Sequence, residues 1–145
     1  TVAKENAVAI GVAERAGFLR SDVFSALPLD KKFDIIVSNP PYIPAADIAG
    51  LAKDVQKEPL GALDGGADGL DFYRRITKEA PLHMVEDGLL AFEIGIYQGE
   101  AVAEMCKAAG FGAVAIRKDY AGIERMVFAA KEGGKYADLL LEIAK

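Results

Sequence analysis

Four consecutive residues, Asn39, Pro40, Pro41 and Tyr42, have the types and the spacing that could hold an NH2 group. Each proline has a fixed φ and pushes the residue before it towards extended geometry. The Pro40 carbonyl is therefore not used inside a helix, and the Asn39 side chain offers a second acceptor, its Oδ1. Tyr42 adds a flat face on which a planar group could stack. This corner presents two rigid acceptors to a group with two donors.

A primary amide or an exocyclic amine is such a group, but its nitrogen is a poor nucleophile because the lone pair is delocalised. Holding both N–H bonds orients that lone pair towards an electrophile and stabilises the positive charge that develops on nitrogen in an SN2 transition state. Positioning can supply on the order of 7–11 kcal/mol of a barrier. No general base is required, in agreement with the lack of a histidine near the motif. The alternative interpretation is a stiff loop that only ends a strand.

The corner follows residues 33–38, FDIIVS, whose apolar and β-branched side chains predict a buried strand. Further strands are predicted at residues 18–20, 89–94, 113–118 and 125–130, with a turn at 86–88. Helices are predicted near the start of the chain and at residues 46–55, 70–85, 98–109 and 136–144. The glycine-rich stretch at 61–69 is interpreted as a flexible loop.

The alternation of strands and helices predicts an α/β fold with a mostly parallel sheet and a C-terminal antiparallel hairpin. Ligands of such sheets bind outside the carboxyl ends of the strands, which is where Asn39 stands. Glu93 closes the next predicted strand and points to the same end, as a candidate site residue or as a cap of the following helix.

Composition indicates one ordinary globular domain of 145 residues, with 52% hydrophobic and 27% charged residues. The net charge of −5 and the lack of a Lys/Arg cluster argue against nucleic acid as a partner. The lone Cys106 cannot form an intramolecular disulfide, and the lone His83 cannot build a metal site, so no metal is expected. Because neither a transmembrane run nor a signal peptide is visible, we expect a cytoplasmic protein.

The amino-acid sequence around the corner resembles the HemK/PrmC family, the peptide-chain-release-factor glutamine N5-methyltransferases. NPPY after an apolar strand is the signature of amino-methyltransferases that use S-adenosylmethionine. The likeness runs from about Lys4 to Ala130 and includes, in order, SNPPYIP, EPLGALDGGADGLDFYRRI, EIGIYQGEAV, AGF and KDYAGIERMV. It implies a class I, Rossmann-like methyltransferase fold. It also implies a substrate glutamine in the Gly-Gly-Gln loop of a release factor.

By that resemblance, Asn39 Oδ1 and the Pro40 carbonyl would be the catalytic groups that hold the glutamine amide. Pro41 and Tyr42 would complete the substrate-binding site. Glu58 belongs to the motifs that resemble the family and is a candidate for ordering the substrate loop.

The resemblance also implies a binding site for S-adenosylmethionine, in which Asp22 matches the acidic position near the adenine and Val23 would lie beside that ring. Asn39 would border the cofactor as well. The family's glycine-rich loop after its first strand, and the acidic residue after its second, have no counterpart here. The chain therefore resembles one partial catalytic domain that lacks the first two strands and the N-terminal helical domain. We expect it to be inactive alone and to bind the cofactor weakly.

In the family's sheet, the missing first strand would lie beside residues 33–38. Without it that strand has an open, apolar edge, which is an aggregation liability. We expect the edge to be covered, either by residues 18–20 or by a second chain in an oligomer.

Two other functions stay open. An N6-adenine nucleic-acid methyltransferase would use the same corner on a base amine, but it would need a basic face and room for a flipped base. The other is a non-catalytic half-domain.

Overall fold

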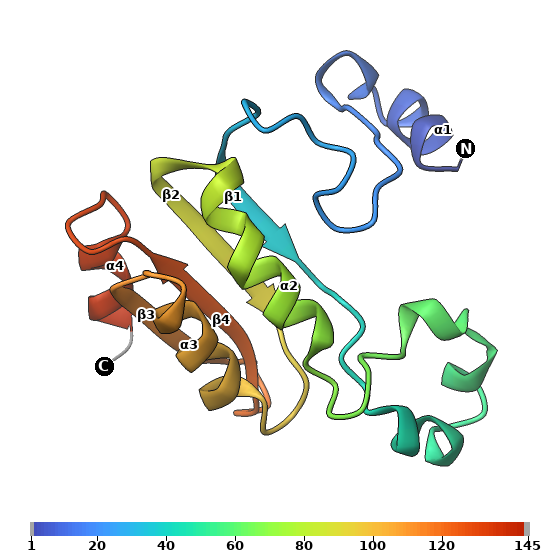
Figure 1. Ribbon diagram of the computed structural model, residues 1–145. Coiled ribbons are helices and arrows are strands. Elements are labelled where there is room, and N and C mark those ends of the chain that lie inside the picture. The colour runs from blue at the N-terminus through green and yellow to red at the C-terminus, as the bar shows by residue number, and fades with distance from the viewer. Residues whose placement is uncertain (1, 144–145) are drawn as a thin grey trace.

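The centre of the molecule is a four-stranded mixed sheet with the strand order β1-β2-β4-β3, seen in a computed structural model that describes residues 2–143 (Figure 1). β1 (Phe33–Ser38) pairs in parallel with β2 (Met84–Glu93). β4 (Glu124–Ala130) runs antiparallel to both β2 and β3 (Ala113–Lys118). Three strands therefore share one direction, and the predicted α/β fold with a C-terminal hairpin is confirmed.

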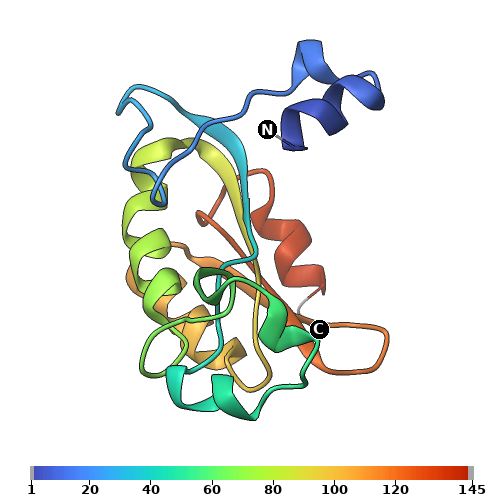
Figure 2. The ribbon, with the colours of Figure 1, turned by 90° about the vertical axis from the view of Figure 1, so that its right-hand side faces the viewer.

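Helices cover both faces of this sheet. α2 and α3 lie on one face, and α4 lies on the other, as the two views show together (Figures 1 and 2). α1 lies apart from the sheet in both views. The α-helices are α1 (Val2–Ala9), α2 (Asp71–Glu79), α3 (Gly99–Ala108) and α4 (Ala137–Ile143). None of the helices in residues 2–143 is long and apolar enough to cross a membrane.

Strand alternation divides the core into two layers. The larger layer lies between the sheet and helices α2 and α3. Its buried members are Tyr73, Ile76, Ala80, Met84, Leu90, Phe92, Ile94, Val102, Cys106, Phe111, Val127 and Ala129. The smaller layer lies under α4 and consists of Ala113, Ala115, Ala130, Ala137 and Leu140. The larger layer fixes the start of α3 and the end of β2, the two elements that face the candidate site.

The bounds predicted for strand 33–38 are confirmed, but its predicted burial is wrong. Ile36 packs towards the larger core layer, whereas Ile35 and Val37 are 48% and 74% exposed. β1 is an edge strand, and within residues 2–143 nothing pairs with its outer side. Residues 18–20 are not a strand, so the expectation that they cover this edge is wrong. Cover by a second chain stays a prediction.

The predicted helix at 70–85 ends early. α2 stops at Glu79, a 3-10 turn follows at Ala80–His83, and β2 already begins at Met84. Pro81 explains the stop, because it has no N–H to donate to the preceding turn. The turn predicted at 86–88 instead lies in an irregular part of β2, where the register with β1 shifts.

The helix predicted at 46–55 is also replaced by shorter elements. The structure has 3-10 turns at Ala45–Gly50, Val55–Lys57 and Leu60–Ala62. Gly50 weakens a continuous helix at this point because glycine loses the most backbone entropy on becoming helical.

Candidate functional site

The site forms where β1 ends and the chain turns through Asn39, Pro40, Pro41 and Tyr42 (the corner). Asn39 is exposed, Pro40 is buried, and the next two residues are half-buried. Within residues 2–143 no group donates a hydrogen bond to Asn39 Oδ1 or to the Pro40 carbonyl. The two acceptors proposed from the sequence are therefore adjacent and unused.

The segment after the corner is fixed by residues 63–66. The Ile43 N–H donates to the Leu63 carbonyl at 3.0 Å, and the Gly65 N–H donates to the Ile43 carbonyl at 2.9 Å. The Ala45 N–H donates to the Gly66 carbonyl at 2.9 Å. The interpretation of this glycine-rich stretch as a flexible loop was wrong, because these backbone hydrogen bonds hold it against the corner.

Two glycines of this stretch allow the close approach. A Cβ at Gly65 would lie 2.9 Å from the Pro41 carbonyl oxygen. Gly69 has a φ of +76°, and a Cβ there would collide with the Tyr42 carbonyl. Only glycine tolerates both the left-handed backbone and the contact. The residues that pack on the corner thus come from a loop to which the sequence analysis assigned no role in the site.

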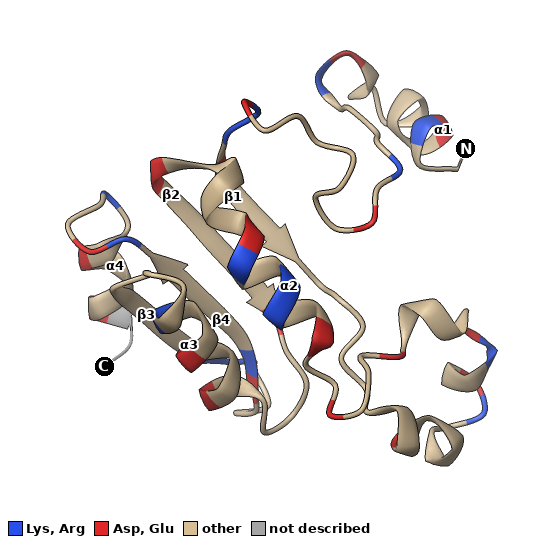
Figure 3. Ribbon diagram, in the orientation of Figure 1, with Lys and Arg blue, Asp and Glu red and all other residues tan. Residues whose placement is uncertain are grey.

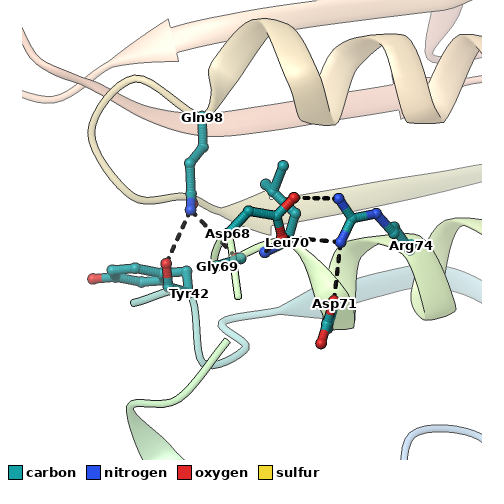
Figure 4. Close-up of polar contacts among 7 residues, drawn as sticks. All are labelled: Tyr42, Asp68, Gly69, Leu70, Asp71, Arg74 and Gln98. Atoms are coloured by element: carbon teal, nitrogen blue, oxygen red, sulfur yellow. Dashed lines mark hydrogen bonds and ion pairs between the residues drawn. The ribbon is translucent and has the colours of Figure 1, made fainter. Parts of the chain in front are cut away.

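Gln98 joins three segments at the site (Figure 4). Its Nε2 donates to the Tyr42 carbonyl at 2.9 Å and to the Gly69 carbonyl at 3.3 Å. Its Oε1 accepts from the Gly95 N–H at 2.9 Å. The sequence reasoning missed this residue. The available signal was its place in the stretch EIGIYQGEAV, which the sequence analysis quoted for the family likeness without giving this residue a role.

Charged side chains tie the same loop to α2 (Figure 4). Arg74 Nη1 donates to Asp68 Oδ1 at 3.0 Å and to Asp71 Oδ1 at 2.9 Å. Asp68 Oδ1 also accepts from the Leu70 N–H at 3.1 Å. The hydrogen bond from Arg74 is the largest of the effects that hold the pKa of Asp68 below its ordinary value.

An apolar cavity of about 250 Å³ lies on one side of the corner. Its walls are Val23, Phe24, Ile36, Val37, Ser38, Pro40, Pro41, Phe72 and Ile76. The Phe24 ring stacks on the buried His83 ring, with centroids 5.0 Å apart. Val23 has a φ of +51°, which is rare for a β-branched residue and costs energy. The cavity is thus bounded by a strained residue and a fixed aromatic ring.

The predicted cofactor residues Asp22, Val23 and Asn39 do not meet at this cavity, since Asp22 and Asn39 are not among its walls. Val23 lines the cavity. Asp22 instead pairs with Arg75 of α2, with Oδ2 and Nη2 2.9 Å apart, and is largely exposed. This pairing raises the pKa of Arg75. The ion pair fastens the loop that carries Val23 to α2.

A second cavity, of about 380 Å³, lies on the other side of the corner. Its walls are Asn39, Pro40, Tyr42, Ile43, Val55, Glu58, Ala62 and Leu63. Glu58, a candidate from the sequence, therefore shares a cavity with Asn39. Pro40 lines both cavities, so the corner is the wall between them.

Glu93, the other candidate, ends β2 with an exposed side chain, and it lines neither of these cavities. Its carbonyl accepts from the Tyr73 hydroxyl at 2.8 Å. Burial raises the pKa of Tyr73 well above its ordinary value, so this hydroxyl stays protonated and keeps donating.

Tyr97 was also missed by the sequence reasoning. It has a φ of +68°, is 95% exposed, and lines a further cavity together with Tyr42.

Basic and acidic residues are mixed over the helices. Figure 3 shows Lys and Arg beside Asp and Glu on α1, α2 and α3. On α2, Arg74 and Arg75 are both engaged in ion pairs. These two guanidinium groups are already neutralised by carboxylates of the same chain.

A mixed sheet with helices on both faces and an acceptor corner at the carboxyl end of β1 has the arrangement of the class I methyltransferase fold. One similar solved structure is the hMettl16 catalytic domain, with a TM-score of 0.67. It is 12% identical and covers 90% of this chain, which covers 51% of that one. At this identity the likeness shows the fold alone. No protein-family profile matches the chain.

Several sequence relatives of the chain share one name. The chain is 48% identical over 129 residues to the release factor glutamine methyltransferase of Cereibacter sphaeroides, a match that covers 88% of this chain and 46% of the relative. The protein of the same name in Moorella thermoacetica is 45% identical over 130 residues, with coverages of 89% and 46%. The one in Bacillus cereus is 46% identical over 134 residues, with coverages of 90% and 47%.

Over most of its length the chain is similar to release factor glutamine methyltransferases, which confirms the resemblance found in the sequence. It spans about half the length of the curated relatives it matches.

Proposed function

We propose that the gene product carrying this chain transfers a methyl group from S-adenosylmethionine to the N5 amide nitrogen of a glutamine. The substrate glutamine lies in the Gly-Gly-Gln loop of a peptide chain release factor. The observation that carries the proposal is that Pro40 lines both cavities, beside two acceptors that nothing else in residues 2–143 uses. A transfer reaction needs donor and acceptor sites that meet at one wall. The names of the relatives supply the substrate class.

The corner holds the nucleophile in this proposal. Asn39 Oδ1 and the Pro40 carbonyl each accept one N–H of the glutamine amide, and Tyr42 packs beside the amide plane. Pro41 keeps the Pro40 carbonyl in a fixed direction because both prolines restrict the backbone. Both acceptors strengthen their hydrogen bonds as positive charge develops on nitrogen, so they stabilise the transition state more than the bound substrate.

The apolar cavity suits part of the cofactor. Val23, Phe24 and Phe72 offer apolar walls of the kind that accommodate a purine ring. S-adenosylmethionine, when bound, supplies an electrophilic methyl group. Residues 2–143 contain no glycine-rich loop between a strand and a helix that would hold the methionine end. We therefore propose that residues 1–145 alone bind the cofactor weakly and transfer no methyl group.

The test is a methyl-transfer assay on the full gene product and, in parallel, on residues 1–145. Candidate substrates are a release factor, the same factor with the loop glutamine replaced by glutamate, and double-stranded DNA. We expect the full gene product to add about 14 mass units to the loop glutamine of the unmodified factor only. Asn39→Ala removes one acceptor and should lower kcat by about 10²–10³, as loss of one transition-state hydrogen bond does elsewhere. An unchanged melting temperature would separate this loss from unfolding.

Each other result has a defined meaning. Methylated adenine in the DNA arm would favour the N6-adenine alternative. No transfer to any substrate by the folded full gene product would favour a non-catalytic half-domain. Full activity of Asn39→Ala would contradict the role given to the corner, and transfer by residues 1–145 alone would contradict the incomplete cofactor site. We expect the reaction with the release factor to take place in the cytoplasm.

A further inference from the structure

We propose that Gln98 is a positioning residue for methyl transfer: its carboxamide sets the direction of the corner relative to the end of β2 and to the glycine-rich loop. This inference rests on the proposed function. Gln98 does not line the cavity that holds Asn39, so its effect on the reacting amide would pass through Tyr42.

The contacts of the Gln98 carboxamide come from three separate parts of the chain. Both donors of Nε2 are engaged, by the carbonyls of Tyr42 and Gly69, and Oε1 accepts from the Gly95 N–H. The bond to Tyr42 joins residues 56 positions apart in sequence. A primary amide is the side-chain group that can donate twice and accept at the same place. Glutamate keeps the acceptor and loses the donors, and methionine keeps the length and loses both.

Neighbouring glycines leave the space that this carboxamide occupies. A Cβ at Gly95 would lie 2.8 Å from Gln98 Oε1 and 3.0 Å from Tyr42 Cδ2. A Cβ at Gly69 would lie 2.7 Å from Gln98 Nε2. The backbone therefore approaches the carboxamide on both sides more closely than any side chain would allow. This arrangement restricts the amide to one place between the two loops.

The anchor for this contact is rigid. Gln98 is the residue before α3, and Val102 and Cys106 of that helix are fully buried in the larger core layer. At the other end, Pro41 limits the backbone between the Tyr42 carbonyl and the Pro40 carbonyl, because it fixes its own φ and restricts the ψ of Pro40. Holding the first carbonyl therefore restricts the direction of the second, which is one of the acceptors for the substrate amide.

The fold does not depend on this contact. The chain after the corner is already held by the backbone hydrogen bonds of Ile43 and Ala45 to residues 63–66. Loss of the Gln98 donors should therefore change the orientation of the corner more than the stability of the protein. A displacement of about 1 Å in a catalytic group can cost about 10²-fold in rate. A change in the position of the corner should therefore be measurable as a change in kcat.

The experiment compares Gln98→Glu and Gln98→Met in the full gene product, with release factor as substrate. We expect kcat to fall by about 10–100-fold in both variants, with KM for the release factor within about threefold of the parent. The melting temperature should change little. Leu140→Ala, in α4 on the other face of the sheet, is the matched control: it creates a cavity in the core and should lower the melting temperature while kcat is retained.

Two kinetic results would overturn the inference. The first is unchanged kcat in both Gln98 variants while the parent is active, which leaves the proposed function intact. The second is a fall in kcat that Leu140→Ala reproduces at equal loss of stability. If the parent itself transfers no methyl group, the proposed function fails and hydrogen exchange decides on the contact. Faster exchange at residues 42–45 and 65–70 in Gln98→Met supports the positioning contact, and unchanged exchange refutes it.

Discussion

What the corner can bind depends on which of the polar groups at and beside it already have a partner in the chain. Asp22 and Asp68 beside the site are paired with arginines, and the Tyr42 carbonyl is taken by Gln98. Asn39 Oδ1 and the Pro40 carbonyl have no donor within the part of the chain that the structure describes. Neutral acceptors suit a neutral amide, because an unpaired carboxylate at this place would also attract cations and water.

The ionisation of Asp68 provides a test at this scale. Arg74→Met should raise the pKa of Asp68 towards its ordinary value, because the hydrogen bond from Arg74 is the main effect that lowers it. A lowered pKa in the folded state stabilises the protein above the unfolded pKa, and this contribution is lost as pH falls through the folded pKa. The dependence of unfolding free energy on pH below about 4 should therefore be weaker in the variant. Carboxyl NMR titration and acid unfolding measure both effects.

Arg75→Met is the control for this change. It removes an arginine from the same helix, but its partner is Asp22, so the Asp68 titration should not move. An equal shift in both variants would show that general charge, and not the Arg74 contact, sets the Asp68 pKa.

At the scale of elements, the site consists of two loops that fit together only because of glycine. The corner is stiff, and the stretch at 65–69 reaches its carbonyls at Gly65 and Gly69. The predicted strand bounds before the corner are confirmed. The packing of the second loop could not be predicted, since the backbone groups that it contacts at Ile43 and Ala45 lie far from it in sequence.

Gly69→Ala tests this packing. The substitution introduces a left-handed alanine and a collision with the Tyr42 carbonyl, so it should destabilise the protein by about 1–3 kcal/mol and lower methyl transfer. Gly110→Ala is the matched control, because Gly110 has a φ of +93° but a Cβ added there would meet no atom within 4 Å. It should show only the backbone cost of about 1 kcal/mol and full activity. Urea unfolding measures the difference, and equal costs would contradict the close approach.

At the scale of the whole molecule, the described chain has one incompletely covered side. β1 is an edge strand, and Ile35 and Val37 are exposed on it. α1 does not cover this edge, because it lies apart from the sheet (Figure 2). An apolar edge with unpaired backbone groups is a template for another strand.

Residues 1–145 in isolation should therefore self-associate through β1. Val37→Lys places a charge on the edge and should shift the chain towards the monomer in sedimentation experiments. Leu29→Lys is the control, because Leu29 is equally exposed, at 75% against 74%, but lies outside the sheet. A monomeric parent chain at high concentration, or an equal effect of the two substitutions, would refute the role of this edge.

The sequence by itself determined the bounds of the strand before the corner, and it predicted the roles of Asn39, Pro40 and Tyr42, which stay a proposal. Proline geometry and strand periodicity act between neighbours in the chain, so they are readable without a structure. The alternation of elements determined the α/β fold for the same reason. Local patterns gave a wrong prediction at two places. The edge strand β1 was predicted to be buried, and the glycine-rich stretch at 61–69 was predicted to be flexible.

Only the tertiary structure decided which distant groups meet at the corner. It brings Gln98 to the Tyr42 carbonyl, Val23 to the Pro40 wall, and Glu58 into the cavity of Asn39. It also pairs Asp22 with Arg75 and leaves β1 at an edge. These contacts depend on how loops cross between strands, and no periodic pattern in the chain encodes such a path.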